Sequence, residues 1–209
     1  MKGLVIAIDG PAGSGKSTVA RAVALELGWS FLDTGAMYRA LTCEALHRSI
    51  PLDDAAAMGE LARSVTLALL PRVTVNGRDV EDDLRSEAVN LSVSVVAAQP
   101  LVRLAMVRRQ REWAHGQSRG TVVEGRDITT VVFPEAALKV FLTATLEERT
   151  QRRGDESEQS VARRDEADTG RESSPLRRAT DAIVLDTTSR TVEEIVREII
   201  QCLMKRHLS

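Results

Sequence analysis

The sequence predicts an α/β fold in which a five-stranded parallel sheet is flanked by helices. Three observations predict this fold. An apolar run at residues 3–9 leads through a glycine-rich turn into a segment with helical spacing. Further short apolar runs then alternate with helical segments, as in parallel strands joined by right-handed crossovers. The chain closes with an amphipathic helix, expected over 192–206, whose apolar residues recur every three or four positions.

The first half of the sheet is predicted from two strand–helix units. The first unit is the strand at 3–9 and a helix that ends at Gly28, a residue suited to the left-handed C′ position. The second unit is a short strand that begins at Trp29 and ends in turn chemistry at Thr34–Gly35, followed by a helix over 36–47.

The second half returns to the same alternation after an interruption. A long helix is expected from Pro100 to Gly116 and a shorter one from Thr145 to Arg153. The remaining three strands are expected at 121–124, 138–142 and 182–186.

The interruption, residues 50–100, does not follow the strand–helix alternation. It offers short β-prone runs around an Asn76–Gly77 turn, with helical segments on either side. We therefore predict an inserted subdomain at 50–100, and a core formed by 1–49 and 101–209.

The glycine-rich turn carries the clearest chemical signal, because residues 10–17 match the phosphate-loop pattern G-x-x-x-x-G-K-[ST]. Backbone N–H groups can surround a triphosphate only where no Cβ intrudes, and the following helix directs its N-terminal dipole at the phosphates. Lys16 is expected to reach the β- and γ-phosphates, and the Ser17 hydroxyl to ligate Mg²⁺. The nucleotide-binding residues predicted here are Gly10, Pro11, Ala12, Gly13, Ser14, Gly15, Lys16, Ser17 and Thr18.

The stretch from Glu147 to Arg178 is rich in arginine and carboxylate, and Val161 and Leu176 are its only sizeable apolar side chains. Such a stretch cannot form a core of its own. It is either a solvated charged arm, as such runs usually are, or a short lid, at about 154–172, that closes arginines over phosphates. The phosphate loop favours the lid, because phosphoryl transfer needs positive charge and the exclusion of water.

Composition limits the cellular setting. The chain has 209 residues, 43% hydrophobic and 28% charged, with a net charge of −2, so it has no global basic field that would favour a nucleic-acid partner. No apolar run approaches the roughly 20 residues of a membrane helix, and the first strand leaves no room for a signal peptide. We expect a cytoplasmic protein, monomeric by default, with no membrane partner.

Four stretches resemble the bacterial cytidylate kinases, within the nucleoside monophosphate kinase group. They are residues 8–18, 32–39 and 124–134, and Arg164–Asp165 followed by Asp168 and Arg171. The resemblance covers nearly the whole chain, and its second and third stretches are more family-specific than the phosphate loop. It implies the phosphate-loop monophosphate-kinase fold, with residues 50–100 as the subdomain that binds the nucleoside monophosphate. It also implies direct in-line transfer from ATP to CMP or dCMP, with Mg²⁺.

The resemblance further implies the acceptor site. The positions that match the family's substrate-binding residues are Asp33, Thr34, Arg39, Arg103, Arg126, Asp127, Asp168 and Arg171, and the expected catalytic residues are Lys16, Arg152, Arg164 and Arg171. Arginine suits phosphate because its planar fork binds two oxygens. Asp127 suits cytosine because a carboxylate accepts from the N4 amino group, where uracil has an acceptor. The family's Asp at the end of the third strand is Glu124 here.

Several alternatives remain open on the sequence alone. Arg126 and Asp127 could form a structural salt bridge at a strand end. The chain could phosphorylate another small acceptor, such as shikimate or dephospho-coenzyme A, although residues 124–127 and the insert argue against it. A guanine-nucleotide switch would need a base-reading motif such as N-K-x-D, which the sequence lacks. A nucleic-acid-dependent ATPase is disfavoured by an aromatic content of only 3%.

Overall fold

The computed structural model describes residues 3–154, 158–171 and 174–207, except for the side chains of Ser160, Arg164 and His207. Arg164, one of the predicted catalytic arginines, therefore has a side chain outside the described residues. The chain divides into two compact units, one formed by Met1–Asp33 with Arg111–Ser209 and the other by Thr34–Gln110. The smaller unit contains residues 50–100, the helix before them and most of the helix after them.

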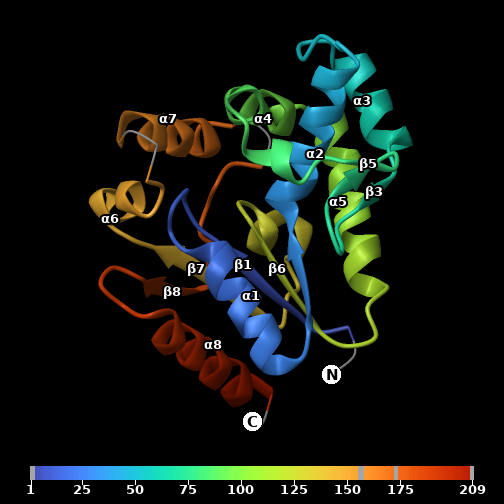
Figure 1. The fold of residues 1–209 in the computed structure, drawn as a ribbon. Coiled ribbons are helices and arrows are strands. Elements are labelled where there is room, and N and C mark those ends of the chain that lie inside the picture. The colour runs from blue at the N-terminus through green and yellow to red at the C-terminus, as the bar shows by residue number, and fades with distance from the viewer. Residues whose placement is uncertain (1–2, 155–157, 172–173, 208–209) are drawn as a thin grey trace. The chain divides into compact units, whose positions relative to one another are not determined.

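The larger unit is built on a parallel sheet, which in the described part of the chain has five strands (Figure 1). Its strands are β1 (Val5–Asp9), β2 (Ser30–Asp33), β6 (Thr121–Gly125), β7 (Leu138–Thr143) and β8 (Ile183–Asp186). Their spatial order is β2-β6-β1-β7-β8, with every pair parallel. The predicted five-stranded parallel sheet is confirmed, and β1 lies at its centre.

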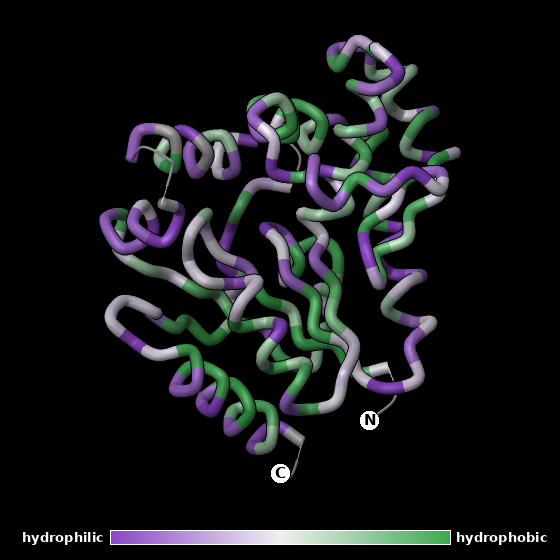
Figure 2. The backbone as a smooth tube through the Cα atoms, viewed as in Figure 1, coloured by the Kyte–Doolittle hydropathy of each residue, from purple (hydrophilic) through white to green (hydrophobic). Residues whose placement is uncertain are grey.

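One face of this sheet shares a core with α1 (Lys16–Leu27) and α8 (Val192–His207). The spacing of the apolar residues explains both helices: Val19 and Val23 of α1, and Ile195 and Ile199 of α8, are buried against the strands. Figure 2 shows the sheet strands mostly as hydrophobic chain, while α8 alternates between hydrophobic and hydrophilic residues. Gly28 ends α1 in the left-handed conformation, as predicted.

The charged stretch after β7 contains more regular structure than its sequence suggested. It forms α6 (Leu146–Gln151) and α7 (Glu158–Thr169). Helix α7 was not predicted, because its sequence has no apolar stripe and Val161 is its single large apolar side chain. Val161 and Leu176 are both buried, so these few apolar groups do pack. A π-helical turn, η2 (Ile128–Val132), follows β6 and was also not predicted.

The smaller unit is mainly helical. Its elements are α2 (Thr34–His47), α3 (Ala55–Ser64), β3 (Leu67–Ala68), β4 (Thr74–Val75), β5 (Arg78–Asp79), the 3₁₀ turn η1 (Asp82–Arg85) and α4 (Glu87–Ala98), and α5 (Pro100–His115) passes from it into the larger unit. The three short strands are antiparallel, as predicted, around the positive-φ residues Asn76 and Gly77. Helix α2 begins at Thr34, two residues earlier than predicted, so the expected Thr34–Gly35 turn is its first turn.

Among the described helices, no single one is long and apolar enough to cross a membrane; α4 and α5 pass such a test only when counted together across a 92° bend.

Candidate active site

The phosphate loop joins β1 to α1, and its glycines are required by the backbone. Gly13 and Gly15 have φ of 76° and 83°, values that L side chains rarely adopt. A Cβ on Gly13 would lie 2.5 Å from the carbonyl oxygen of Arg149, and one on Gly10 would overlap the carbonyl oxygen of Leu142. The loop is therefore a bare-backbone cradle closed in by α6 and β7, which is the geometry an anion needs.

Lys16 is folded over this loop. Its side chain is buried, and Nζ donates a hydrogen bond to the carbonyl oxygen of Pro11 at 2.8 Å. Burial lowers the pKa of Lys16, and the positive charge of Arg126 lowers it further, while the carboxylates of Glu124 and Asp168 act in the opposite direction. A bound phosphate would stabilise the ammonium ion that burial disfavours.

Ser17 and Glu124 bring two oxygens together at the N-terminus of α1. The Ser17 hydroxyl donates to Oε1 of Glu124 at 2.7 Å. Burial and the nearby Asp33 raise the pKa of Glu124. A hydroxyl and a carboxylate are donors that suit Mg²⁺, which usually takes one or two protein ligands and completes its shell with phosphates and water. The Ser17–Glu124 pair therefore fits a magnesium site that is shared with phosphates. Among the described residues there is no group of three or more His, Cys, Asp or Glu that could hold a metal.

Three of the predicted acceptor-site residues lie together: Arg126 and Arg171 both pair with Asp168. Arg126 Nε donates to Asp168 Oδ2 at 2.6 Å, and Arg171 Nη2 pairs with the other carboxylate oxygen. Burial opposes the ionisation of Asp168, but the two guanidinium groups outweigh it and hold the pKa of Asp168 below its usual value. Asp127, next to Arg126, is also buried. The structure thus unites residues from the end of β6 with residues of α7 and the segment after it.

Arg149 and Asp165 belong to this region and were missed as site residues. Arg149 is buried, donates to the carbonyl oxygen of Ala12 at 3.0 Å and pairs with Asp165. Asp165 also accepts from the backbone N–H of Ala12 at 3.2 Å. Helix α7 is therefore attached to the phosphate loop itself. The Arg164–Asp165 motif contains Asp165 but indicates no partner for it, and no pattern in the sequence distinguishes Arg149 from the other arginines.

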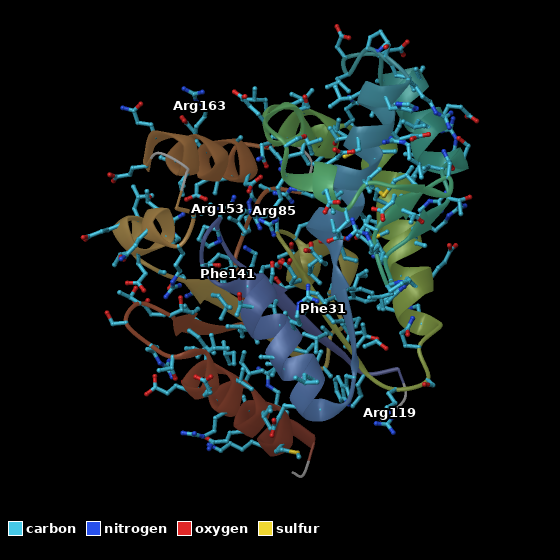
Figure 3. The ribbon with its side chains drawn as sticks, in the orientation of Figure 1. Phe31, Arg85, Arg119, Phe141, Arg153 and Arg163 are labelled. Atoms are coloured by element: carbon cyan, nitrogen blue, oxygen red, sulfur yellow. The ribbon has the colours of Figure 1, made fainter. Side chains whose placement is uncertain are left out.

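Arg152, predicted as catalytic, is bound to the segment between β8 and α8. Its Nη1 donates to Oγ1 of Thr187 at 2.9 Å and its Nη2 to the Thr187 carbonyl oxygen at 2.8 Å. The Thr187 hydroxyl lies 3.2 Å from the carbonyl oxygen of Ser14, in the phosphate loop. Arg152 thus lies beside the loop and is linked to it through Thr187. Arg163, in contrast, is exposed and projects outward from α7 (Figure 3).

The smaller unit carries Thr34, Arg39 and Arg103. Thr34 is buried in the first turn of α2, directly after Asp33, and Arg39 lies further along the same helix. Arg103 is buried on α5, donates to the carbonyl oxygen of Ala97 at 3.2 Å, and lies 5.9 Å from the centre of the Tyr38 ring. A hydrogen bond and a cation–π contact thus link Arg103 to other residues of its own unit.

Comparison with known proteins adds to this geometry. Residues 6–205 match the family model described as cytidylate kinase. A cytidylate kinase from Geobacillus kaustophilus is 47% identical over 218 aligned positions, covering 96% of this chain and 96% of that protein. A cytidylate kinase from Halalkalibacterium halodurans is 46% identical over 223 positions, covering 99% and 100%. The crystal structure of TT1252 from Thermus thermophilus has a TM-score of 0.57 at 20% identity and covers 99% of both chains, which shows a shared fold alone.

Proposed function

The chain belongs to the cytidylate kinase family, and on this premise we propose that it transfers the γ-phosphoryl group of ATP to CMP or dCMP, giving ADP and CDP or dCDP. One structural observation supports this activity in addition to membership of the family. Helix α7 links the phosphate loop of Lys16 to Arg126, because its Asp165 accepts from the backbone N–H of Ala12 in the loop and its Asp168 accepts from Arg126. A donor-phosphate lysine beside an acceptor-phosphate arginine is the arrangement that phosphoryl transfer between two phosphates requires.

On the donor side, the backbone amides of the phosphate loop and Lys16 would hold the triphosphate. Lys16 would exchange its hydrogen bond to Pro11 for one to a phosphate oxygen, since both groups accept from Nζ. Ser17 and Glu124 would hold Mg²⁺, which supplies charge neutralisation on the β- and γ-phosphates. Arg152 would add positive charge at the edge of the loop.

On the acceptor side, Arg126 and Arg171 would bind the monophosphate, with Asp168 setting the direction of both guanidinium groups. The family resemblance also assigns Thr34, Arg39 and Arg103, which belong to the smaller unit, to binding of the acceptor. Because the acceptor is already a phosphate anion, no covalent intermediate and no general base are needed, and the protein's task is to position and to neutralise charge.

Specificity for cytosine would come from Asp127. A carboxylate accepts from the cytosine N4 amino group and repels the O4 acceptor of uracil, and a buried polar mismatch is the kind of error that a binding site rejects strongly. We expect residues 50–100 to act as the monophosphate-binding subdomain and about 154–172 as the lid, in a monomeric cytoplasmic enzyme.

The experiment that tests the proposal compares Asp127→Ala with wild type in an ADP-release assay across CMP, dCMP, UMP, AMP, GMP and shikimate. Wild type should prefer CMP and dCMP. Loss of a hydrogen bond to a charged group removes about 1.5–3 kcal/mol, so Asp127→Ala should lower kcat/KM for CMP by about 10- to 150-fold. The efficiency for UMP should fall much less, because its repulsion is relieved by the same change.

The matched control is Asp53→Ala, which removes an exposed carboxylate and should leave the ratio of CMP to UMP efficiency unchanged. Equal losses for CMP and UMP in Asp127→Ala would make Asp127 structural and contradict its base-reading role. A wild-type protein that uses shikimate and ignores CMP would contradict the proposed function as a whole.

A further inference from the structure

Asp9 is a buried carboxylate whose partners lie far away in sequence. It ends β1, directly before the phosphate loop, and is completely buried. Its Oδ1 accepts from the backbone N–H of Ile128 at 2.9 Å, and its Oδ2 accepts from Thr129, at 2.7 Å from N and 2.6 Å from Oγ1. All three donors belong to the first turn of η2, which follows Arg126–Asp127.

Asp9 therefore caps the N-terminus of η2, although it lies outside that turn in the sequence. The residue at the N-cap position of η2 is Asp127, and an Asp there ordinarily accepts from the first free amides of its own helix. The Asp127 side chain makes no such capping hydrogen bond. Because Asp9 accepts from the amides of Ile128 and Thr129, the carboxylate assigned to base reading is not required for capping.

The other end of the same turn is bound by Arg111. Its Nε donates to the carbonyl oxygen of Val132 at 2.8 Å, and its Nη2 donates to that of Val131 at 2.7 Å. A negative group at the N-terminus and a positive group at the C-terminus both complement the dipole of a helical turn. The π-helical turn, a form frequent at functional sites, is thus held at both ends by charged side chains from β1 and α5.

We propose that Asp9 and Arg111 are positioning residues that hold the Arg126–Asp127 turn in fixed register with the phosphate loop, so that the acceptor base is read at a set distance from the donor phosphates. The inference rests on the proposed function, since it takes Asp127 as the group that reads the base. A small displacement of η2 would move Asp127 away from the base, and a misplacement of about 1 Å can cost roughly 100-fold in rate.

The electrostatics of Asp9 agree with a positioning role. Burial raises the pKa of Asp9 to about 6, and the hydrogen bonds from Thr129 and Ile128 act against that rise. The negative charge of Asp127 raises the pKa of Asp9 further, and the charge of Asp9 acts to raise the pKa of Lys16. Among the described residues Asp9 has no ion pair, so its burial is unfavourable for stability. A carboxylate retained in such a place is better explained by what it holds than by a contribution to the core.

The test measures KM for CMP and for ATP, and the ratio of CMP to UMP efficiency, in Arg111→Gln, Thr129→Val and Asp9→Asn. Removing a hydrogen bond typically weakens binding by about 3- to 10-fold. Arg111→Gln and Thr129→Val should raise KM for CMP by that factor and lower the CMP to UMP ratio, with KM for ATP within about twofold of wild type. Thr129→Ser keeps the hydroxyl and should restore KM for CMP.

Arg109→Gln is the matched control, because Arg109 lies on the same helix and also binds two carbonyl oxygens, those of Ala62 and Arg63. It should leave the CMP to UMP ratio unchanged. Arg111 is exposed, so its variant keeps the test valid even where Asp9→Asn does not fold. A CMP to UMP ratio equal to wild type in Arg111→Gln and Thr129→Val would overturn the inference, as would equal rises in both KM values. Failure of the proposed function would instead be visible in wild type, as a preferred acceptor other than CMP, and the same variants would then be assayed with that acceptor.

Discussion

The phosphate loop, residues 10–18, and the charged segment that contains α6 and α7, called the arm below (described residues 145–154 and 158–171), meet at Ala12 but are stabilised by different interactions. The loop depends on bare backbone: two of its glycines have positive φ near 80°, and its neighbours approach as carbonyl groups. The arm depends on charged side chains, with Arg149, Asp165 and Asp168 buried or half-buried in ion pairs. Figure 2 shows the contrast, since the strand before the loop is hydrophobic while α6 and α7 carry many hydrophilic residues.

The loop supplies rigidity to this site, and the arm supplies charge. Backbone cradles cannot relax without changing φ, so the loop can present fixed amides to a phosphate. Ion pairs can exchange partners, so under the proposed function a guanidinium of the arm would move from its carboxylate to a phosphate.

The largest effect is expected at Lys16, where the loop supplies its own charge. Lys16→Met keeps an unbranched side chain that is one atom shorter and removes the ammonium. Loss of one preorganised charge-stabilising donor typically lowers kcat by about 100- to 1,000-fold, and kcat for CMP should fall at least that far. Circular dichroism and thermal unfolding should show an intact fold, because the methionine occupies the same buried space. Turnover near the wild-type value would contradict the phosphate-loop assignment.

The next prediction separates two reasons for glycine in the loop, which are the positive φ and the lack of space for a Cβ. Gly13→Ala and Gly15→Ala both force an L residue into the left-handed region, which costs roughly 1–2 kcal/mol. At Gly13 the new methyl would also lie 2.5 Å from the carbonyl oxygen of Arg149, whereas at Gly15 its nearest neighbour is the flexible end of Arg152, at 3.7 Å. Gly13→Ala should therefore lower the free energy of unfolding by about 1–3 kcal/mol more than Gly15→Ala. Urea denaturation of both variants measures the difference. Equal losses of unfolding free energy would mean that α6 can shift away from the new methyl group at little cost.

The same contrast explains what could be predicted from the sequence. The glycine spacing, Lys16 and Ser17 are a local pattern, so the loop and the parallel sheet around it were predictable. The arm's partners are 16 residues apart for Arg149 and Asp165, and 153 apart for Asp165 and Ala12. No periodicity links such pairs, and in a chain with 28 basic residues no single arginine stands out. Helix α7 was missed for the same reason, because ion pairs rather than an apolar stripe hold it in place.

A double-mutant cycle on Arg149 and Asp165 tests whether the arm's ion pairs are energetically significant. The side chains are 10% and 22% exposed, and buried partners in one network couple by about 1–2 kcal/mol. The control cycle uses Arg63 and Glu60, a helical pair whose side chains are 53% and 68% exposed. That pair should couple by no more than about 0.5 kcal/mol. Urea unfolding of the alanine variants gives both values, and equal couplings would mean that the arm's pairs are as weak as surface pairs.

The smallest effect concerns the pH dependence of stability. It compares Asp9, the buried carboxylate that precedes the loop, with Asp181, a carboxylate that is paired with a lysine. Burial raises the folded-state pKa of Asp9 to about 6, from 3.8. The folded protein therefore binds a proton on Asp9 between pH 4 and 6 that the unfolded chain does not bind, so the stability linked to this group is present at low pH and is lost as the pH rises through 6. Asp181, whose pKa is lowered by its hydrogen bond from Lys139, behaves oppositely, and its linked stability is lost only as the pH falls below about 4.

Wild type should therefore gain about 1 kcal/mol of stability relative to Asp9→Asn when the pH falls from 6.5 to 5, because each pKa unit corresponds to about 1.4 kcal/mol. The nearby Lys16 adds to the change in the same direction: its lowered pKa falls further when the charge of Asp9 is removed, so the variant gains stability relative to wild type as the pH rises. Asp181→Asn is the control, and its difference from wild type should stay constant over this range, since both states of Asp181 are ionised there. Urea denaturation at pH 5, 5.5, 6 and 6.5 measures both differences. A wild-type advantage over Asp9→Asn that is flat across these values would mean that the hydrogen bonds from Ile128 and Thr129 keep Asp9 fully ionised in the folded protein. In that case Asp9 resembles the ion-paired carboxylates of the arm in its titration, and the contrast between loop and arm would rest on geometry alone.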